Sequence, residues 1–217
     1  MGLVLVTVCF GGSLAVDGFT AHGGPPAPST GVRPPGPDSA APMAPASAAG
    51  EMRPAPPMAA SPPTRISIPM VRVEAPVGTV GLTADGTVAA PPPDNANLAA
   101  WYTGSPTPGA LGTAVVVGHV DAKGGRAVFY DIATLHKGTT IRVARQDGST
   151  AVFTVYGIQV FKKADFPVER VYGGTGFAEL RILTCGGKYD KKQGYTGNVV
   201  VFARLTGEGP PGQSMHT

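Results

Sequence analysis

The stretch Leu180-Arg181-Ile182-Leu183-Thr184-Cys185-Gly186-Gly187 predicts an apolar β-strand that ends on a threonine and a cysteine and breaks at two glycines. We therefore expect Cys185 at the exposed tip of a rigid element, where its thiol can reach a substrate. The other cysteine, Cys9, lies in an apolar N-terminal run and is a poor candidate for a disulfide partner. An unpaired thiol in a chain with export features is consistent with a reactive nucleophile. The alternative is a buried cysteine that packs as a small, inert hydrophobe.

A second apolar run, residues 113–121, places a histidine at the end of a predicted strand. A cysteine nucleophile needs a nearby imidazole, and the two residues are commonly far apart in sequence. A structural histidine is the alternative, but the matched strand-end positions of His119 and Cys185 favour a catalytic pair.

Together these residues resemble the sortases, the cysteine transpeptidases of Gram-positive cell surfaces. Leu183-Thr184-Cys185 matches the end of the family signature Thr-Leu-x-Thr-Cys, with Arg181 where the first threonine is expected, and Gly118-His119 matches the histidine motif. The Gly-His-Val-Asp and Thr-Cys-Gly-Gly forms are most similar to the actinobacterial class E/F type. Further similarity to the first and last strands of the family lies in residues 66–69, 74–77 and 198–202, so the resemblance spans roughly residues 65–207.

Short β-rich runs separated by turn signals indicate an all-β barrel or sandwich. The resemblance implies an eight-stranded sortase-type β-barrel with one or two short helices. Asp85-Gly86 and Asp147-Gly148 predict hairpin turns. Asn95 to Trp101 is predicted as a short helix, introduced by Pro93 and Asp94, and Phe166 to Tyr172 as one helical turn.

The resemblance also implies a reaction and its partners. Cys185 would attack the Thr–Gly bond of a Leu-Pro-x-Thr-Gly-type sorting signal on a surface protein and form a thioester. His119 would protonate the leaving amine and deprotonate the incoming one. The incoming amine would come from a peptidoglycan precursor or a pilin, and neither a cofactor nor a metal is expected.

The third residue of the family is an arginine on the strand after the cysteine loop. Counting thirteen residues beyond Cys185, as in the best-known members, reaches Asn198 instead. We predict Asn198 as the third catalytic residue, because an amide donates hydrogen bonds to an oxyanion. Arg204 and Arg181 remain alternatives. Asp121 either orients the imidazole or faces water.

Composition divides the chain into four segments. Residues 1–20 form an apolar signal or membrane-anchor segment, and residues 21–64 form a linker that we expect to be disordered, since 13 of the 23 prolines fall between His22 and Thr64. Residues 65–207 form the predicted catalytic domain and residues 208–217 a flexible tail. The net charge of +3 is modest and its basic groups are scattered, which gives nucleic-acid binding little support.

These features predict a sortase-like enzyme outside the cytoplasm, secreted or held at the cell membrane by its N-terminal segment. Two alternatives stay open. One is a hydrolytic cysteine peptidase that uses the same pair of residues, and the other is a non-catalytic β-domain that binds peptides.

Overall fold

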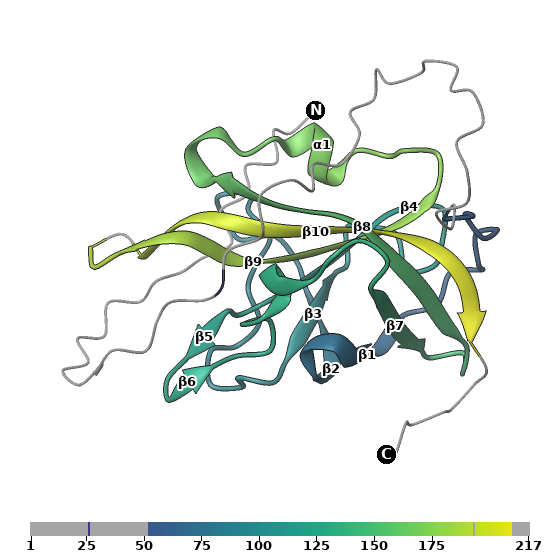
Figure 1. The fold of residues 1–217 in the computed structure, drawn as a ribbon, viewed down its shortest axis with the longest axis horizontal. Helices are drawn as coiled ribbons and strands as arrows, with labels where there is room; N and C mark the ends of the chain where they lie inside the picture. Colours follow the sequence, from purple (N-terminus) through teal and green to yellow (C-terminus); the bar gives the residue numbers. More distant parts are fainter. Residues whose placement is uncertain (1–25, 27–51, 193, 210–217) are drawn as a thin grey trace.

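The computed structural model describes Pro26 and residues 52–192 and 194–209, and eight of its strands close into a barrel (Figure 1). Around the barrel the order is β1-β2-β3-β4-β9-β10-β8-β7, with β2–β3 and β4–β9 parallel and the other pairs antiparallel. The predicted all-β fold with eight barrel strands is therefore confirmed. The barrel strands are β1 (Pro63–Ile68), β2 (Val73–Val80), β3 (Ala99–Tyr102), β4 (Gly112–Gly118), β7 (Thr140–Arg145), β8 (Thr150–Lys162), β9 (Ala178–Asp190) and β10 (Gly194–Gly209).

The other elements of the described chain are short. A two-stranded ribbon of β5 (Asp121–Ala122) and β6 (Gly125–Arg126) follows β4. The predicted turn after Phe166 is confirmed as α1 (Val168–Tyr172), and three 3₁₀ turns are η1 (Pro69–Val71), η2 (Ile132–Thr134) and η3 (Lys163–Asp165).

The helix predicted for residues 95–101 is wrong. That segment holds turns and then enters β3, whose Ala99 and Ala100 are almost fully buried between β2 and β4. A helix of this length is marginal on its own. Pairing with two neighbouring strands therefore outweighs the local cap signal.

Side chains of the central strands β4, β9 and β10 alternate between two apolar layers. One set, which includes Ile182, points into the barrel and joins its main core. The other set, which includes Leu183, points outward and packs beneath Val171 of α1, which lies over this face in Figure 1. Because both faces are covered, β9 reads as a nearly continuous apolar run rather than an alternating one.

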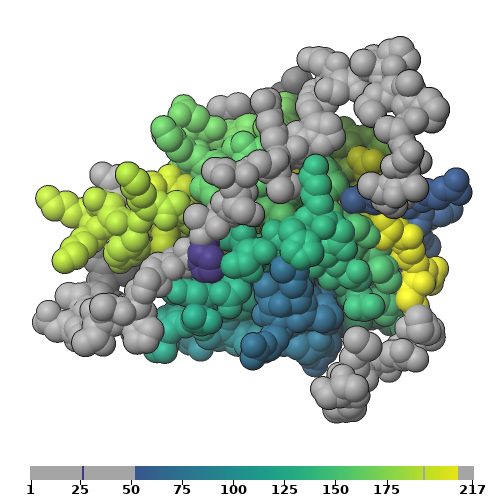
Figure 2. All heavy atoms as spheres, in the orientation of Figure 1, coloured from purple at the N-terminus to yellow at the C-terminus, as the bar shows by residue number. Residues whose placement is uncertain are grey.

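β9 does not stop at the two glycines, so the prediction of an exposed strand tip at Cys185 is wrong. Cys185 is only 9% exposed, and the strand continues to Asp190. Gly187 has a φ of 81°, and the β9–β10 register shifts beside it, which is the geometry of a β-bulge. The glycines therefore bend the strand, and the hairpin beyond them stands out from the body of the molecule (Figure 2, yellow-green).

Residues 52–62, which precede the predicted domain boundary, are attached to the barrel. The amide of Ala55 donates to the Leu205 carbonyl (2.9 Å) and that of Met58 to the Gly109 carbonyl (2.8 Å). Both side chains pack against the main core. This segment therefore belongs to the folded unit, and residues 1–20 of the predicted anchor lie outside the described residues.

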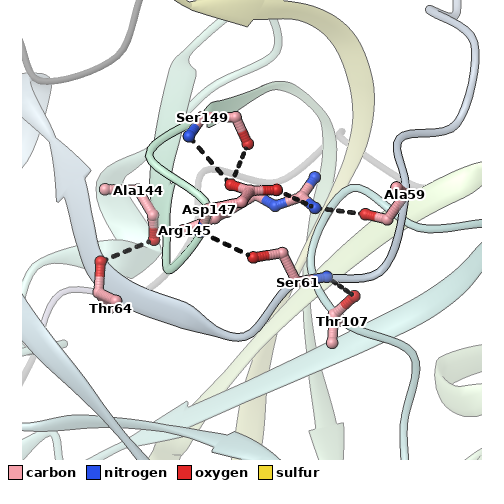
Figure 3. A network of polar contacts seen from close by, with 8 residues as sticks. All are labelled: Ala59, Ser61, Thr64, Thr107, Ala144, Arg145, Asp147 and Ser149. Atoms are coloured by element: carbon pink, nitrogen blue, oxygen red, sulfur yellow. Dashed lines mark hydrogen bonds and ion pairs between the residues drawn. The ribbon is translucent and has the colours of Figure 1, made fainter.

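A buried arginine fastens the same segment at its other end (Figure 3). Arg145, whose side chain is fully buried, donates through Nη2 to the Ala59 carbonyl and to Asp147 Oδ2. The Asp147 amide in turn donates to Ser61 Oγ at 3.1 Å. The β7–β8 turn, which forms at the predicted Asp147-Gly148, thus holds the segment before β1 through hydrogen bonds.

At the C-terminal end, β10 passes the predicted boundary at residue 207. Glu208 and Gly209 still pair with Ala151 and Thr150 of β8. Among the described residues, no helix is long and apolar enough to cross a membrane.

We predict that two truncations separate the attached segment from the rest. With the protein reduced, so that no disulfide contributes, removal of residues 1–51 should leave the free energy of unfolding unchanged. Removal of residues 1–64 should lower it by at least about 2 kcal/mol, because the buried Arg145 guanidinium loses the Ala59 carbonyl. Urea unfolding followed by circular dichroism measures both. Equal midpoints for the two truncations would contradict a fastening role for residues 52–62.

Candidate active site

The three predicted site residues lie on neighbouring strands, with Cys185 in the middle. In the antiparallel β9–β10 pair, Asn198 is the direct partner of Cys185. Residues opposite one another in this way have Cβ atoms about 5 Å apart on the same face. The thirteen-residue count in the sequence therefore corresponds to a true cross-strand neighbour.

His119 reaches the same place from the other side. The last parallel β4–β9 pair is Val117 with Leu183, and His119 and Cys185 each lie two residues further along. The strands β4 and β9 stay side by side one residue beyond that pair, because Thr184 Oγ1 donates to the Gly118 carbonyl at 2.8 Å. His119 thus lies at the end of β4, next to the β9 position of Cys185 and on the outward-facing side.

The imidazole is held in one tautomer by the backbone. His119 Nε2 lies 2.8 Å from the Pro91 carbonyl oxygen. A carbonyl oxygen only accepts, so Nε2 carries the proton and Nδ1 is left as the basic nitrogen. The sequence offered no signal for this contact, because its acceptor is a main-chain atom 28 residues away.

Gly118 is needed for the close packing beside His119. A Cβ at this position would lie 2.5 Å from Cδ2 of Phe129. The ring of Phe129 is fully buried, and its amide donates to the His119 carbonyl at 3.0 Å. Because Gly118 has no side chain, the Phe129 ring can pack directly against the end of β4.

Cys185 is disulfide-bonded in this structure, and no described cysteine is free. The prediction of an unpaired thiol is wrong for this state of the chain. Cys9, which the sequence made a poor partner, lies outside the described residues. A thiolate reaction at Cys185 needs the reduced form, because a sulfur already bonded to sulfur is no nucleophile.

Asn198 is fully buried, and neither its Nδ2 nor its Oδ1 has a hydrogen-bond partner in the described structure. A buried amide without partners costs about 1–3 kcal/mol. An unpartnered donor opposite Cys185 therefore adds no stability to the fold. It is consistent with a group that forms its hydrogen bond with a bound molecule.

Asp121 is exposed to water, which is the second of the two alternatives predicted for it, and it also has a side-chain partner. Its Oδ2 accepts a 2.6 Å hydrogen bond from the hydroxyl of Tyr195. Tyr195 in turn packs in one small cluster with Val120 and Cys185. Sequence reasoning missed Tyr195, since 74 residues separate it from Asp121.

Arg181 and Arg204, the two alternatives to Asn198, both form ion pairs with the carboxylate of Glu179. Glu179 is fully buried, and its Oε1 accepts from Arg204 Nη2 at 2.8 Å while its Oε2 accepts from Arg181 Nη2 at 2.5 Å. Arg181 is paired across the sheet with Phe202, and its guanidinium lies 4.6 Å from that ring. Both arginines thus belong to a structural ion-pair network around Glu179, near the start of β9.

This network governs the ionisation of Glu179. Burial by itself raises the pKa of this carboxyl. The charge of Arg181 and hydrogen bonds from Arg204, Arg181 and Tyr156 outweigh that effect, so the pKa lies below its ordinary value of 4.5. Glu179 therefore stays charged at neutral pH.

Among the described residues, no group of three or more His, Cys, Asp or Glu side chains could hold a metal ion.

Comparison with known proteins places the chain in a class. The family model described as "Sortase domain" matches residues 66–206. Sortase A of Listeria monocytogenes has a TM-score of 0.53 at 19% identity, covering 71% of this chain and 94% of that one. Sortase A of Corynebacterium diphtheriae has a TM-score of 0.52 at 18% identity, covering 68% of this chain and 62% of that one. Sortase C-1 of Actinomyces oris has a TM-score of 0.52 at 19% identity, covering 66% of this chain and 73% of that one. No curated protein sequence matches.

The fold and the family match together define this protein as a sortase-type domain. The chain belongs to the sortase family, a family of cysteine transpeptidases. The structural likenesses, all below 25% identity, establish the shared barrel. The narrower class E/F assignment stays a prediction from the Gly-His-Val-Asp and Thr-Cys-Gly-Gly motifs.

We predict that Glu179→Gln lowers the free energy of unfolding by about 3–5 kcal/mol at neutral pH, because two guanidinium groups then lose their buried charged partner. The folded-state pKa of Glu179 is lowered, so its contribution is full above about pH 4.5 and is lost as the pH falls through the folded value. The gap between variant and wild type should therefore shrink in acid.

The matched control for this substitution is Glu74→Gln. Glu74 forms an ion pair with Arg65 in which both side chains are more than half exposed. Its loss should change the free energy of unfolding by less than about 1 kcal/mol. Equal effects of the two substitutions in urea titrations at pH 7 would show that the buried network contributes nothing special.

Proposed function

We propose that the reduced protein is a transpeptidase in which Cys185 attacks the Thr–Gly bond of a Leu-Pro-x-Thr-Gly-type sorting signal. Support for this proposal comes from the β-sheet register, which pairs Asn198 with Cys185 and runs the end of β4, just before His119, alongside the same stretch of β9. The thiolate forms a thioester with the threonine carbonyl, and the peptide beyond the bond leaves as an amine. A second amine then attacks the thioester and regenerates the thiol.

His119 serves the proton transfers in this scheme. With the Nε2 proton donated to the Pro91 carbonyl, Nδ1 takes the proton of the Cys185 thiol, gives it to the leaving amine and later accepts a proton from the incoming one. The fixed tautomer keeps this nitrogen available without a ring flip. The imidazole therefore needs no carboxylate to orient it.

Asn198 donates from Nδ2 to the oxyanion that develops on the threonine carbonyl. Its buried, unpartnered amide opposite Cys185 supports this role. A neutral donor is about half as strong as a charged one, so we expect slower turnover than an arginine would give. Arg181 and Arg204 are held by Glu179 and supply no charge here.

The apolar layer around the site supports a substrate with apolar residues. Leu183, Val117 and Val200 face outward next to the three site residues and are fully buried under other side chains of the chain. A peptide that carries leucine and proline would bind by replacing part of that cover.

The partners follow from this reaction. The acyl donor is a surface protein with a C-terminal sorting signal, and the acceptor is an amine of a peptidoglycan precursor or a pilin. We place the enzyme outside the cytoplasm at a Gram-positive surface, with residues 1–20 as signal or anchor.

We predict that Cys185→Ala abolishes thioester formation with a Leu-Pro-x-Thr-Gly peptide and leaves the fold intact. Mass spectrometry of the reduced protein after mixing with peptide detects the adduct, and circular dichroism checks the fold. With an amine acceptor present, the wild type should yield the transpeptidation product. If water alone resolves the thioester, the protein is a hydrolytic peptidase. Turnover retained by the alanine variant would remove Cys185 from the mechanism.

We further predict that His119→Ala lowers the rate by about 10²- to 10⁴-fold, the usual loss when an acid–base group is removed. Peptide binding should survive, because the imidazole acts on the proton rather than on the substrate backbone. Stopped-flow acylation and equilibrium peptide binding separate the two. A rate within a few-fold of wild type would mean that another group moves the proton.

Asn198→Ala should slow acylation by about 10²- to 10³-fold, the range for a lost oxyanion donor. Arg204→Ala is the control on the same strand. It breaks the pair with Glu179, so it should lower stability but not the rate per folded molecule. A large loss of rate confined to Arg204→Ala or Arg181→Ala, with Asn198→Ala near wild type, would assign the role to an arginine.

A further inference from the structure

A hydrogen bond joins the segment after His119 to the strand that carries Asn198. The hydroxyl of Tyr195 in β10 donates to Asp121 Oδ2 in β5 at 2.6 Å. Asp121 is two residues beyond His119, and Tyr195 is three residues before Asn198. The bond therefore bridges the two outer members of the site, and Cys185 lies on the strand between them.

The ring of Tyr195 packs where the nucleophile lies. Tyr195 and Cys185 are each 9% exposed and form one cluster with Val120, against which Tyr130 packs. The ring of Tyr189 meets that of Tyr195 edge-on, with centroids 5.1 Å apart. The ring therefore has a fixed place beside Cys185, and its hydroxyl has a fixed direction.

The hydroxyl remains a donor throughout the neutral range. Burial, followed by the hydrogen bond to Asp121, raises the pKa of Tyr195 well above its ordinary value of 10. The titratable groups that face Tyr195 are Asp121, Tyr130 and Tyr189, together with the Cys185 thiol of the reduced protein. A phenol that stays protonated and donates to a carboxylate forms a charge-assisted hydrogen bond, which is stronger than a neutral one.

His119 is held by the Phe129 amide and the Pro91 carbonyl, but neither of these bonds joins it to β9 or β10. Ladder pairing of β4 with β9 ends at Val117, and the bond from Thr184 reaches only Gly118. From His119 onward the chain leaves β9 and turns into the β5–β6 ribbon. The bond from Tyr195 ties this departing segment to β10, across the position of Cys185.

We propose that Tyr195 and Asp121 are positioning residues, which hold the His119 segment against β10 so that the imidazole stays within reach of the Cys185 thiol. Neither residue touches the reacting atoms in this scheme. The proposal rests on the proposed function, because a positioning role has meaning only if Cys185 and His119 form the catalytic pair. A displacement of about 1 Å in such a pair can cost on the order of 10²-fold in rate.

The first test is Tyr195→Phe, which keeps the ring and removes only the hydroxyl. We expect the acylation rate constant to fall about 10- to 100-fold with little change in KM for the peptide. The matched control is Tyr156→Phe, because Tyr156 also donates to a carboxylate, that of Glu179, at 2.9 Å. The control should destabilise the fold without slowing acylation per folded molecule.

The second readout is the reactivity of the thiol itself, measured with iodoacetamide across pH in the reduced Cys9→Ser background, where Cys185 is the single thiol. A displaced imidazolium stabilises the thiolate less, so Tyr195→Phe should shift the alkylation midpoint to higher pH. Asp121→Ala should do the same. Asp121→Asn, whose amide oxygen still accepts from the hydroxyl but without charge assistance, should shift the midpoint less than Asp121→Ala.

Three outcomes would overturn the proposal: an unchanged alkylation midpoint in Tyr195→Phe, an equal shift in Tyr156→Phe, or a full shift in Asp121→Asn. If the wild type forms no thioester with any sorting peptide, the proposed function fails. The alkylation profile still tests the positioning role in that case, because it needs no substrate.

Discussion

The parallel pairing of β4 with β9 is the constraint on which the site depends. β9 is buried on both faces from Ala178 to Gly186, so its register with each neighbour is strongly fixed. A slip of one residue would turn Cys185 into the barrel core and Thr184 outward. The same register places Asn198 opposite the cysteine and carries His119 to the adjacent strand end.

Charge is separated from the site along the same strand. Glu179 binds both nearby arginines in a buried network near the start of β9, whereas Cys185 lies further along the strand, opposite the neutral amide of Asn198. The network stabilises the barrel and at the same time keeps guanidinium groups away from the reaction. An oxyanion at Cys185 would therefore be stabilised by oriented neutral donors, which act strongly when water is excluded.

Predictions from the local sequence were wrong at two places where a strand pairs with neighbours on both sides. The cap before residue 95 predicted a helix, but pairing with β2 and β4 makes Ala99–Tyr102 a strand. Gly186 and Gly187 read as a strand end, yet β10 continues to pair past them through a bulge. In both cases the hydrogen bonds come from a neighbouring strand, β2 and β4 for β3 and the hairpin partner β10 for β9, which local propensity does not include.

The sequence by itself determined the all-β class, the hairpin turn at Asp147-Gly148 and the cysteine and histidine motifs, because these rest on local pattern and residue chemistry. The choice of a barrel over a sandwich came from the resemblance to the family. The spacing from Cys185 to Asn198 was also readable, since a hairpin converts a residue count into a cross-strand neighbour. Only the tertiary structure decided that Glu179 holds the arginines, that Pro91 fixes the imidazole and that Tyr195 reaches Asp121. Each of these contacts joins segments whose approach depends on how the barrel closes.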